Sequence, residues 1–165
     1  MAGPSALANR TGESHAETMP PETPDTAHQG IAVIDEERCL RLVGGESIGR
    51  LGFSARAMPV IFPINFVLIG RDVVFRTEPG QKLDAARLQA VACFEVDSYD
   101  GFAHTGWSVL MTGRLAVTEG PALDRLGPLP LRPWAVTGAS DVVTLRGELI
   151  SGRAVEPFNG RVITK

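Results

Sequence analysis

A run of apolar residues, MPVIFPINFVLI from Met58 to Ile69, constrains the fold more than any other part of this chain. Because nearly every residue from Pro59 to Leu68 is apolar, the run predicts a β-strand covered on both faces, at the centre of a barrel or at an interface. The turn at Gly70 to Asp72 leads into VVFRT, so the two segments predict a hairpin. Pro63 has no N–H group and cannot donate a hydrogen bond to a neighbouring strand. We therefore expect unpaired backbone groups near it.

Short strands and a few helices are predicted for the rest of the chain. The helix after Asp35 has a cap and an acidic first turn, a second follows Pro79 at LDAARLQA, and a third begins at Pro121. Strands are predicted at IGRLGFS, at VACFEVDS, from Trp107 to Thr118 with a bend at Gly113, and once or twice within DVVTLRGELISGRAV. An irregular loop, YDGFAHTG, and a stiff connector, PLPLRP, lie between them. This pattern predicts a mainly β fold, a small β-barrel with helical decorations.

The length of 165 residues fits one domain, and the composition divides the chain into two parts. Residues 1–30 are rich in Pro, Thr, Ser, Glu and Ala, so we expect a disordered N-terminal tail before a folded domain over residues 31–165. The chain shows neither a secretory signal nor an apolar segment long enough to cross a bilayer. These features predict a soluble protein with no membrane partner.

Charge, cysteine and histidine content exclude several classes of function. A formal net charge of -3 and a pI near 5.6 argue against a general nucleic-acid binder. Cys39 and Cys93 lack CxxC spacing, which argues against a disulfide scaffold or a zinc site and favours a reduced, cytoplasmic protein. His15 and His28 lie in the tail, where histidines are usually solvated, so no metal site is predicted.

Arg76, Thr77 and Lys82 gather around Pro79 and Gly80, where a strand ends and a helix begins. A helix start offers unpaired backbone N–H groups and the positive end of the helix dipole, and the neighbouring cations and hydroxyl make it a seat for a dianion. The segment therefore predicts a phosphate-binding site beside the apolar strand. The alternative is that Arg76 and Lys82 are solvated surface charges.

No set of side chains indicates chemistry by the protein itself. The sequence holds no Ser, His and Asp set at recognisable spacing, no paired carboxylates and no GxGxxG after a strand. Any redox reaction would therefore be a cofactor's, and we assign no catalytic residue. His104 could donate protons or lie exposed in its loop, and Arg56 could reach a phosphate from the opposite side.

The order of these elements, with VIFPINF followed by VVFRTEPGQK and later GWSVLMTGRL, resembles the pyridoxamine 5′-phosphate oxidase-like family of flavin-binding split barrels. The resemblance covers the chain from about Asp35 to about Val155. It implies a split barrel of about six antiparallel strands, assembled as a homodimer that holds FMN at the subunit interface. The end of the chain, SGRAVEPFNGRVITK, lacks the Arg and His substrate signature of the oxidases proper. A flavin site is therefore better supported than vitamin B6 chemistry.

The resemblance also implies roles for individual residues. Thr77 and Lys82 match the family's phosphate-binding residues, with Arg76 beside them, while Gln81 replaces a basic residue and weakens the seat. Trp107 falls where the partner subunit's strand commonly approaches the flavin, although an aromatic residue on an alternating strand also fills the core. The strand whose backbone follows the isoalloxazine ring corresponds to Ile61, Phe62, Pro63, Ile64 and Asn65.

The isoalloxazine ring is flat and largely apolar, so it suits a slot with aliphatic and aromatic walls. The expected walls are the side chains of Ile61, Phe62, Ile64 and Phe66. Asn65 is the polar side chain in this run, and a buried amide should pair with the sheet or with the ring edge. The strand from Val60 to Leu68 carries more apolar surface than one small core can cover, which also favours a homodimer.

Together these expectations predict an FMN-dependent oxidoreductase that transfers hydride or electrons between NAD(P)H and a small organic substrate. The alternative is a flavin-binding protein without turnover, acting in storage, sensing or stress response. The same barrel with a deazaflavin coenzyme would need a basic groove, for which Arg50, Arg56 and Arg114 are local candidates. With haem it would need an axial ligand, and His104 is the histidine outside the tail.

Overall fold

The computed structural model describes residues 31–129, 131 and 141–155, which form eight strands and three helices. In chain order the elements are β1 (Ile31–Ile34), α1 (Glu36–Gly44), β2 (Ile48–Ala55), β3 (Met58–Ile69), β4 (Asp72–Thr77), α2 (Gln81–Arg87), β5 (Val91–Asp100), β6 (Thr105–Val117), α3 (Pro121–Leu126), β7 (Asp141–Leu145) and β8 (Leu149–Val155). The predicted disordered tail, residues 1–30, lies outside the described residues, as does much of the PLPLRP connector.

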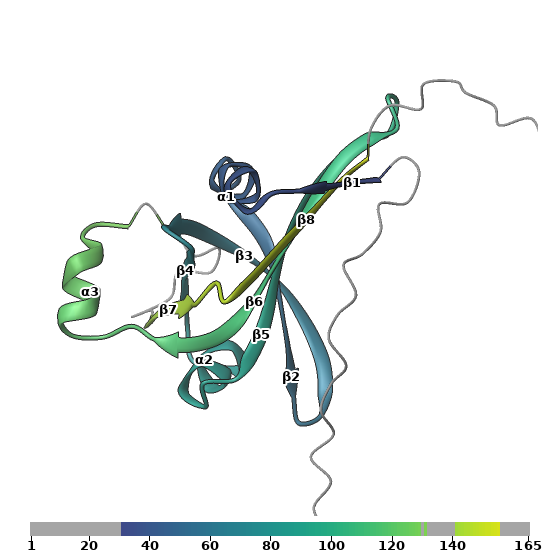
Figure 1. Cartoon of the computed structure of the whole chain (residues 1–165). Helices are drawn as coiled ribbons and strands as arrows, with labels where there is room; N and C mark the ends of the chain where they lie inside the picture. Colours follow the sequence, from purple (N-terminus) through teal and green to yellow (C-terminus); the bar gives the residue numbers. More distant parts are fainter. Residues whose placement is uncertain (1–30, 130, 132–140, 156–165) are drawn as a thin grey trace, which may run out of the picture.

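Six antiparallel strands close into a barrel. Their hydrogen-bonded order is β6-β5-β2-β3-β4-β7, and β7 pairs again with β6, so the ring is complete. β8 pairs with the first part of β6, and β1 pairs with β8, which adds two strands outside the ring. Figure 1 shows these two strands and the β5–β6 hairpin running beyond the barrel as an arm. The predicted mainly β fold, a small barrel of about six antiparallel strands with two or three short helices, is confirmed.

On its edge away from β5, β6 changes its partner strand at Gly113. Residues 106–112 of β6 pair with β8, and residues 115–117 pair with β7. Between these two stretches the backbone carbonyl of Arg146 lies so close to Gly113 that a Cβ atom there would overlap it. The sequence predicted a bend at this glycine, and the structure supplies the reason, since neighbouring backbone occupies the space of a side chain.

The barrel interior is filled by side chains that alternate inward along each strand. On β6 the inward residues Val109, Met111 and Leu115 are completely buried, as the alternating pattern predicted. The largest fully buried side chains of the core include Phe75, Phe94, Leu51 and Leu83.

Two helices cover the barrel from opposite sides in Figure 1. α1 begins where the Asp35 carboxylate accepts a hydrogen bond from the Arg38 N–H at 2.8 Å, and it buries Cys39. α2 packs Leu83 into the core and contacts β2, β6 and β7. α3 begins at Pro121, so all three predicted helices are present.

β3 differs from its prediction in how it is covered. Ile64 and Phe66 are only 5% and 3% exposed, but Met58 is 66% and Ile61 is 70% exposed. Within the single chain the first half of β3 is therefore not covered on both faces, and cover at an interface, the other predicted location, stays a prediction. The outward side chains in the first half of β3 have no second layer above them within the described residues.

The segment expected to be an irregular loop, YDGFAHTG, is the tip of the β5–β6 hairpin. Tyr99 and Asp100 still belong to β5, and pairing resumes at Thr105. The carboxylate of Asp100 accepts hydrogen bonds from the N–H groups of Ala103 at 3.0 Å and Phe102 at 2.9 Å, which hold the pKa of Asp100 below its ordinary value. Only the four residues from Gly101 to His104 form the turn, so the loop prediction was too long.

We expect the variant Gly113→Ala to lower the free energy of unfolding by about 3 kcal/mol, because the new Cβ would push β6 away from the Arg146 carbonyl. Urea unfolding followed by circular dichroism measures this change.

The matched control is Gly44→Ala at the end of α1, where a Cβ would meet the nearest side-chain atom, Leu68 Cδ2, at an ordinary 3.8 Å. We expect this variant to stay within about 1 kcal/mol of the parent protein. Equal losses in the two variants would contradict the role given to the close approach at Gly113.

Candidate cofactor-binding site

One edge of β3 has no partner strand over much of its length. β2 pairs with β3 along residues 58–65, whereas β4 pairs only with residues 66–69. On the side away from β2, the backbone groups of residues 58–65 therefore belong to no strand ladder within the described chain. Backbone groups need hydrogen-bond partners when they are covered, so this edge can bind the polar rim of a ligand. Pro63, which has no N–H group to donate, lies within this edge, where the sequence predicted unpaired backbone groups.

The first turn of α2 brings Lys82 to this part of β3. Lys82 Nζ lies 4.8 Å from the centroid of the Phe62 ring, within the range of a cation–π interaction. Among the described residues no carboxylate lies within 4.0 Å of this ammonium group, so its charge is not compensated by an ion pair. Gly80 precedes the helix with φ 151° and contributes no side-chain cap.

The Phe62 ring packs against a second aromatic ring, that of Phe53. The centroids of Phe53 and Phe62 lie 5.8 Å apart with their planes inclined by 27°, and Phe53 is 6% exposed. Phe62 therefore lies between the core and Lys82. Phe53 is not among the site residues predicted from the sequence, although Leu51 and Phe53 alternate in IGRLGFS and so signal two inward-pointing residues on the neighbouring strand.

Thr77 is the buried polar residue of the predicted phosphate seat. It lies at the end of β4, is 5% exposed, and its hydroxyl donates to the Glu78 carbonyl at 3.2 Å. Arg76 is half-buried beside it, and Gln81 is exposed at the first position of α2. The hydroxyl and Lys82 thus flank the turn between β4 and α2.

The residues predicted to follow the ring point to different sides of β3. Ile61 and Pro63 are exposed and face outward, and Asn65 is half-buried. Ile64 and Phe66 belong to the barrel core, so their side chains do not form an open wall as expected. In this segment the open surface is made by the outward side chains and by the unpaired edge of the strand.

Trp107 does not lie beside Lys82 within one chain. The strand register aligns Phe62 with Leu51, then Phe94, then Met111 across four strands. Trp107 lies four residues before Met111 on β6, roughly 13 Å away at the usual rise per residue. It is half-buried at the base of the arm and packs against the core.

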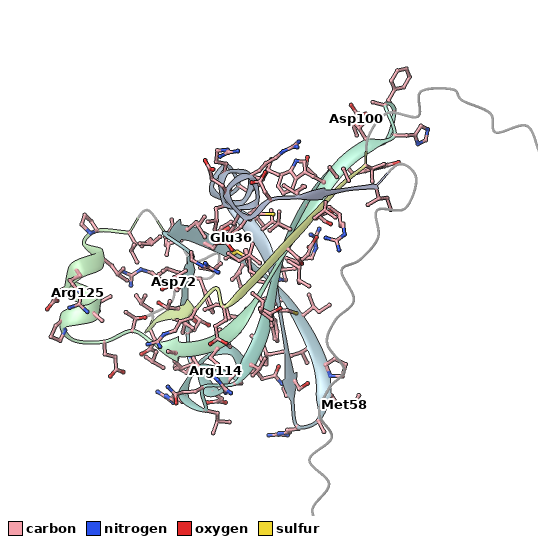
Figure 2. All side chains as sticks on the ribbon, viewed as in Figure 1. Glu36, Met58, Asp72, Asp100, Arg114 and Arg125 are labelled. Carbon is pink, nitrogen blue, oxygen red and sulfur yellow. The ribbon has the colours of Figure 1, made fainter. Side chains whose placement is uncertain are left out.

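His104 lies still further away, in the turn at the tip of the arm. Its Nδ1 is 3.2 Å from the Tyr99 hydroxyl, and both residues are exposed. Figure 2 shows Asp100 at this tip and Met58 at the far end of the β2–β3 hairpin. Within one chain His104 is therefore separated from the candidate site.

Two of the three arginines considered for a basic groove are engaged elsewhere. Arg50 forms ion pairs with Asp97 at 2.5 Å and Glu95 at 3.0 Å, and hydrogen bonds to these two carboxylates raise its pKa further above the ordinary value. Arg114 donates to the Gln89 carbonyl at 3.3 Å. Arg56 lies in the tight β2–β3 turn with φ 50°. The charge of Arg50 in particular is already balanced.

The described ranges contain neither a candidate membrane span nor a candidate metal centre. No helix there has both the length and the apolar character needed to cross a membrane. No group of three His, Cys, Asp or Glu side chains there is arranged to hold a metal ion.

The arrangement fits a ligand with an anionic group at one end and a flat apolar body at the other. The ammonium of Lys82, which has no carboxylate partner in the described chain, suits the anion, and the exposed half of β3 suits the body. The Thr77 hydroxyl can donate to the same anion when it releases the Glu78 carbonyl. A flavin nucleotide has this construction. The described residues can bind and orient such a group, whereas the chemistry would be the group's own.

Known proteins share this fold. The FAD binding protein from Mycobacterium smegmatis matches with a TM-score of 0.64 and 30% identity, covering 76% of this chain and 98% of that one. The FAD and Heme binding protein from Mycobacterium smegmatis matches with a TM-score of 0.58 over 79% of this chain and 77% of that one, and its 21% identity shows the fold alone. An uncharacterized protein of Mycobacterium tuberculosis is 29% identical over 135 residues, 79% of this chain and 88% of that protein.

The family model described as pyridoxamine 5'-phosphate oxidase matches residues 35–154. This range agrees with the predicted span from about Asp35 to about Val155, and it includes every strand of the barrel. The chain therefore belongs to the pyridoxamine 5'-phosphate oxidase family.

Proposed function

We propose that this chain binds a flavin nucleotide, with a phosphate between Lys82 and Thr77 and the isoalloxazine ring along the unpaired edge of β3. The observation that carries the proposal is the uncompensated Lys82 ammonium beside a strand whose edge has no ladder partner among the described residues. The relative named as an FAD binding protein supports a flavin independently of this geometry.

FMN is the flavin that the family resemblance implies, and FAD is the one named for the relative with 30% identity. A phosphate monoester such as FMN carries close to two negative charges, whereas each phosphate of FAD carries one. A seat with one lysine and a neutral Gln81 supplies one positive charge. This charge balances one phosphate of FAD more fully than the dianionic phosphate of FMN. Chromatography of the flavin released from the purified protein on heating distinguishes the two.

The proposed activity is a flavin-dependent oxidoreductase acting on a small organic substrate with NAD(P)H as electron donor. A bound flavin supplies hydride or electron transfer. The chain's own residues would hold the phosphate at Lys82, align the ring by backbone hydrogen bonds along β3, and exclude water with outward apolar side chains such as Ile61.

We also propose that the functional unit is a homodimer formed through the outward face of the barrel strands and of β8 beside them. Five apolar side chains on this face are between 43% and 71% exposed in the single chain: Ile48, Ile61, Val91, Leu110 and Leu149. Exposed apolar surface of this kind usually marks an interface. In a dimer the arm of the partner subunit could bring the partner's Trp107 to the site.

A haem or a deazaflavin in the same barrel stays an alternative. The FAD and Heme binding protein from Mycobacterium smegmatis has the same fold. Haem would need an axial ligand, and His104 lies on the arm, away from Lys82 in the same chain. The absorption spectrum of the purified protein separates flavin, deazaflavin and haem.

We expect the variant Lys82→Met to weaken flavin binding by about ten- to a hundredfold, because a hydrogen bond to a charged group contributes roughly 1.5 to 3 kcal/mol. Isothermal titration of the flavin-free protein with FMN and with FAD measures the dissociation constants.

The control variant is Arg87→Met, which removes an exposed cation from the last turn of the same helix. We expect its affinity to stay within about twofold of the parent, since an isolated surface charge contributes little. Equal losses in both variants would refute the phosphate seat, and a parent protein that binds neither flavin would refute the proposed function.

We expect NADH or NADPH to bleach the flavin absorption band of the flavin-loaded protein under anaerobic conditions at a catalytic rate, because the bound ring accepts hydride from a reduced nicotinamide. Stopped-flow absorbance measures the rate. A spectrum that stays unchanged with both nucleotides would contradict the oxidoreductase and favour a flavin-binding protein without turnover.

We expect Ile61→Asp to convert the dimer to a monomer at micromolar concentration and to weaken flavin binding with it, because a charge would have to be buried in the interface. Sedimentation velocity measures the change. Leu88→Asp is the control, since Leu88 is 80% exposed at the end of α2 and outside these strands. A monomeric parent protein, or dissociation by both variants, would contradict the proposed interface.

A further inference from the structure

We propose that Phe62 is a positioning residue for Lys82: its ring holds the ammonium group at the phosphate seat without neutralising the charge. This inference rests on the proposed flavin binding, but it assigns Phe62 a role other than a wall for the isoalloxazine ring.

Phe62 contacts both Lys82 and Phe53. Its ring centroid lies 4.8 Å from Lys82 Nζ and 5.8 Å from the centroid of the Phe53 ring. Phe53 is anchored in the core at 6% exposure. Phe62 is also fixed by its strand, because its backbone pairs with Leu51 of β2. The ring therefore has little freedom to move away from Lys82.

The chemistry of this contact differs from that of an ion pair. A carboxylate beside Lys82 would also fix the side chain, but it would compete with an anionic ligand for the same charge. The face of an aromatic ring attracts an ammonium group through its quadrupole and carries no net charge. In the described chain Lys82 has no carboxylate partner, so the positive charge is held in place and stays available.

The benefit to binding is the ordering of a long side chain before the ligand arrives. A lysine side chain has several rotatable bonds, and fixing them on binding reduces affinity. When Phe62 already restricts Lys82, most of this loss is avoided. Without the ring we expect affinity for the flavin phosphate to fall by about three- to tenfold.

The test is a double-mutant cycle with Phe62→Leu and Lys82→Met, in which the dissociation constants of FMN and FAD are measured by isothermal titration. Leucine keeps an apolar side chain and removes the aromatic face. We expect Phe62→Leu to weaken binding by about three- to tenfold in the parent protein and by less than about twofold when Lys82 is already methionine. Phe62→Tyr keeps the ring face, and we expect it to bind like the parent.

A second measurement does not depend on flavin. Lys82 and Lys165 are the two lysines of the chain, so selective ¹³C labelling gives two ε-methylene signals, and Lys82→Met assigns them. A ring face close to Nζ shifts the Lys82 protons upfield in the flavin-free protein. We expect this shift in the parent and in Phe62→Tyr and its loss in Phe62→Leu.

The outcomes separate the inference from the function on which it rests. A parent protein that binds neither FMN nor FAD overturns both. A parent that binds flavin while Phe62→Leu binds equally well, or loses the same factor with and without Lys82, overturns the positioning role and leaves the proposed function in place. An unshifted Lys82 signal in the flavin-free parent also overturns it.

Discussion

The difference in length between β3 and β4 is the constraint on which the candidate site depends. β3 has 12 residues and β4 has six, and their pairing stops at Phe66 and Phe75. The last two residues of β4, Arg76 and Thr77, pair with β7 alone and lead into α2. Residues 58–65 of β3 pair with β2 alone. The barrel can close around its core and still keep one stretch of strand edge outside any ladder, which is where Lys82 meets Phe62.

Closure of the ring and extension of the arm both depend on β6. This strand has 13 residues, which is long enough to pair with β8 on the arm and with β7 in the ring. The change of partner needs a position without a side chain, and Gly113 provides it. As a result Trp107 lies on the arm, where a second chain could use it, rather than at the site of its own chain.

The outward face of the barrel combines apolar side chains with one compact ionic group. Arg50, Glu95 and Asp97 neutralise much of one another's charge in the middle of this face. Charges that are paired before association are less costly to cover than isolated ones. A face of this composition is suited to self-association through its aliphatic residues, with the ionic group limiting the permitted alignments.

The sequence by itself determined the class of fold, the three helices, the β3–β4 hairpin and the gathering of Thr77 and Lys82 around one turn, because turn residues, caps and alternation are local signals. It did not predict β1, a strand of four residues that exists through pairing with β8, nor how far the β5–β6 hairpin extends. Only the tertiary structure decided which half of β3 is covered and that Phe62 contacts both Phe53 and Lys82. Those contacts join β2, β3 and α2, and their alignment follows from strand register and helix packing, which no local pattern encodes.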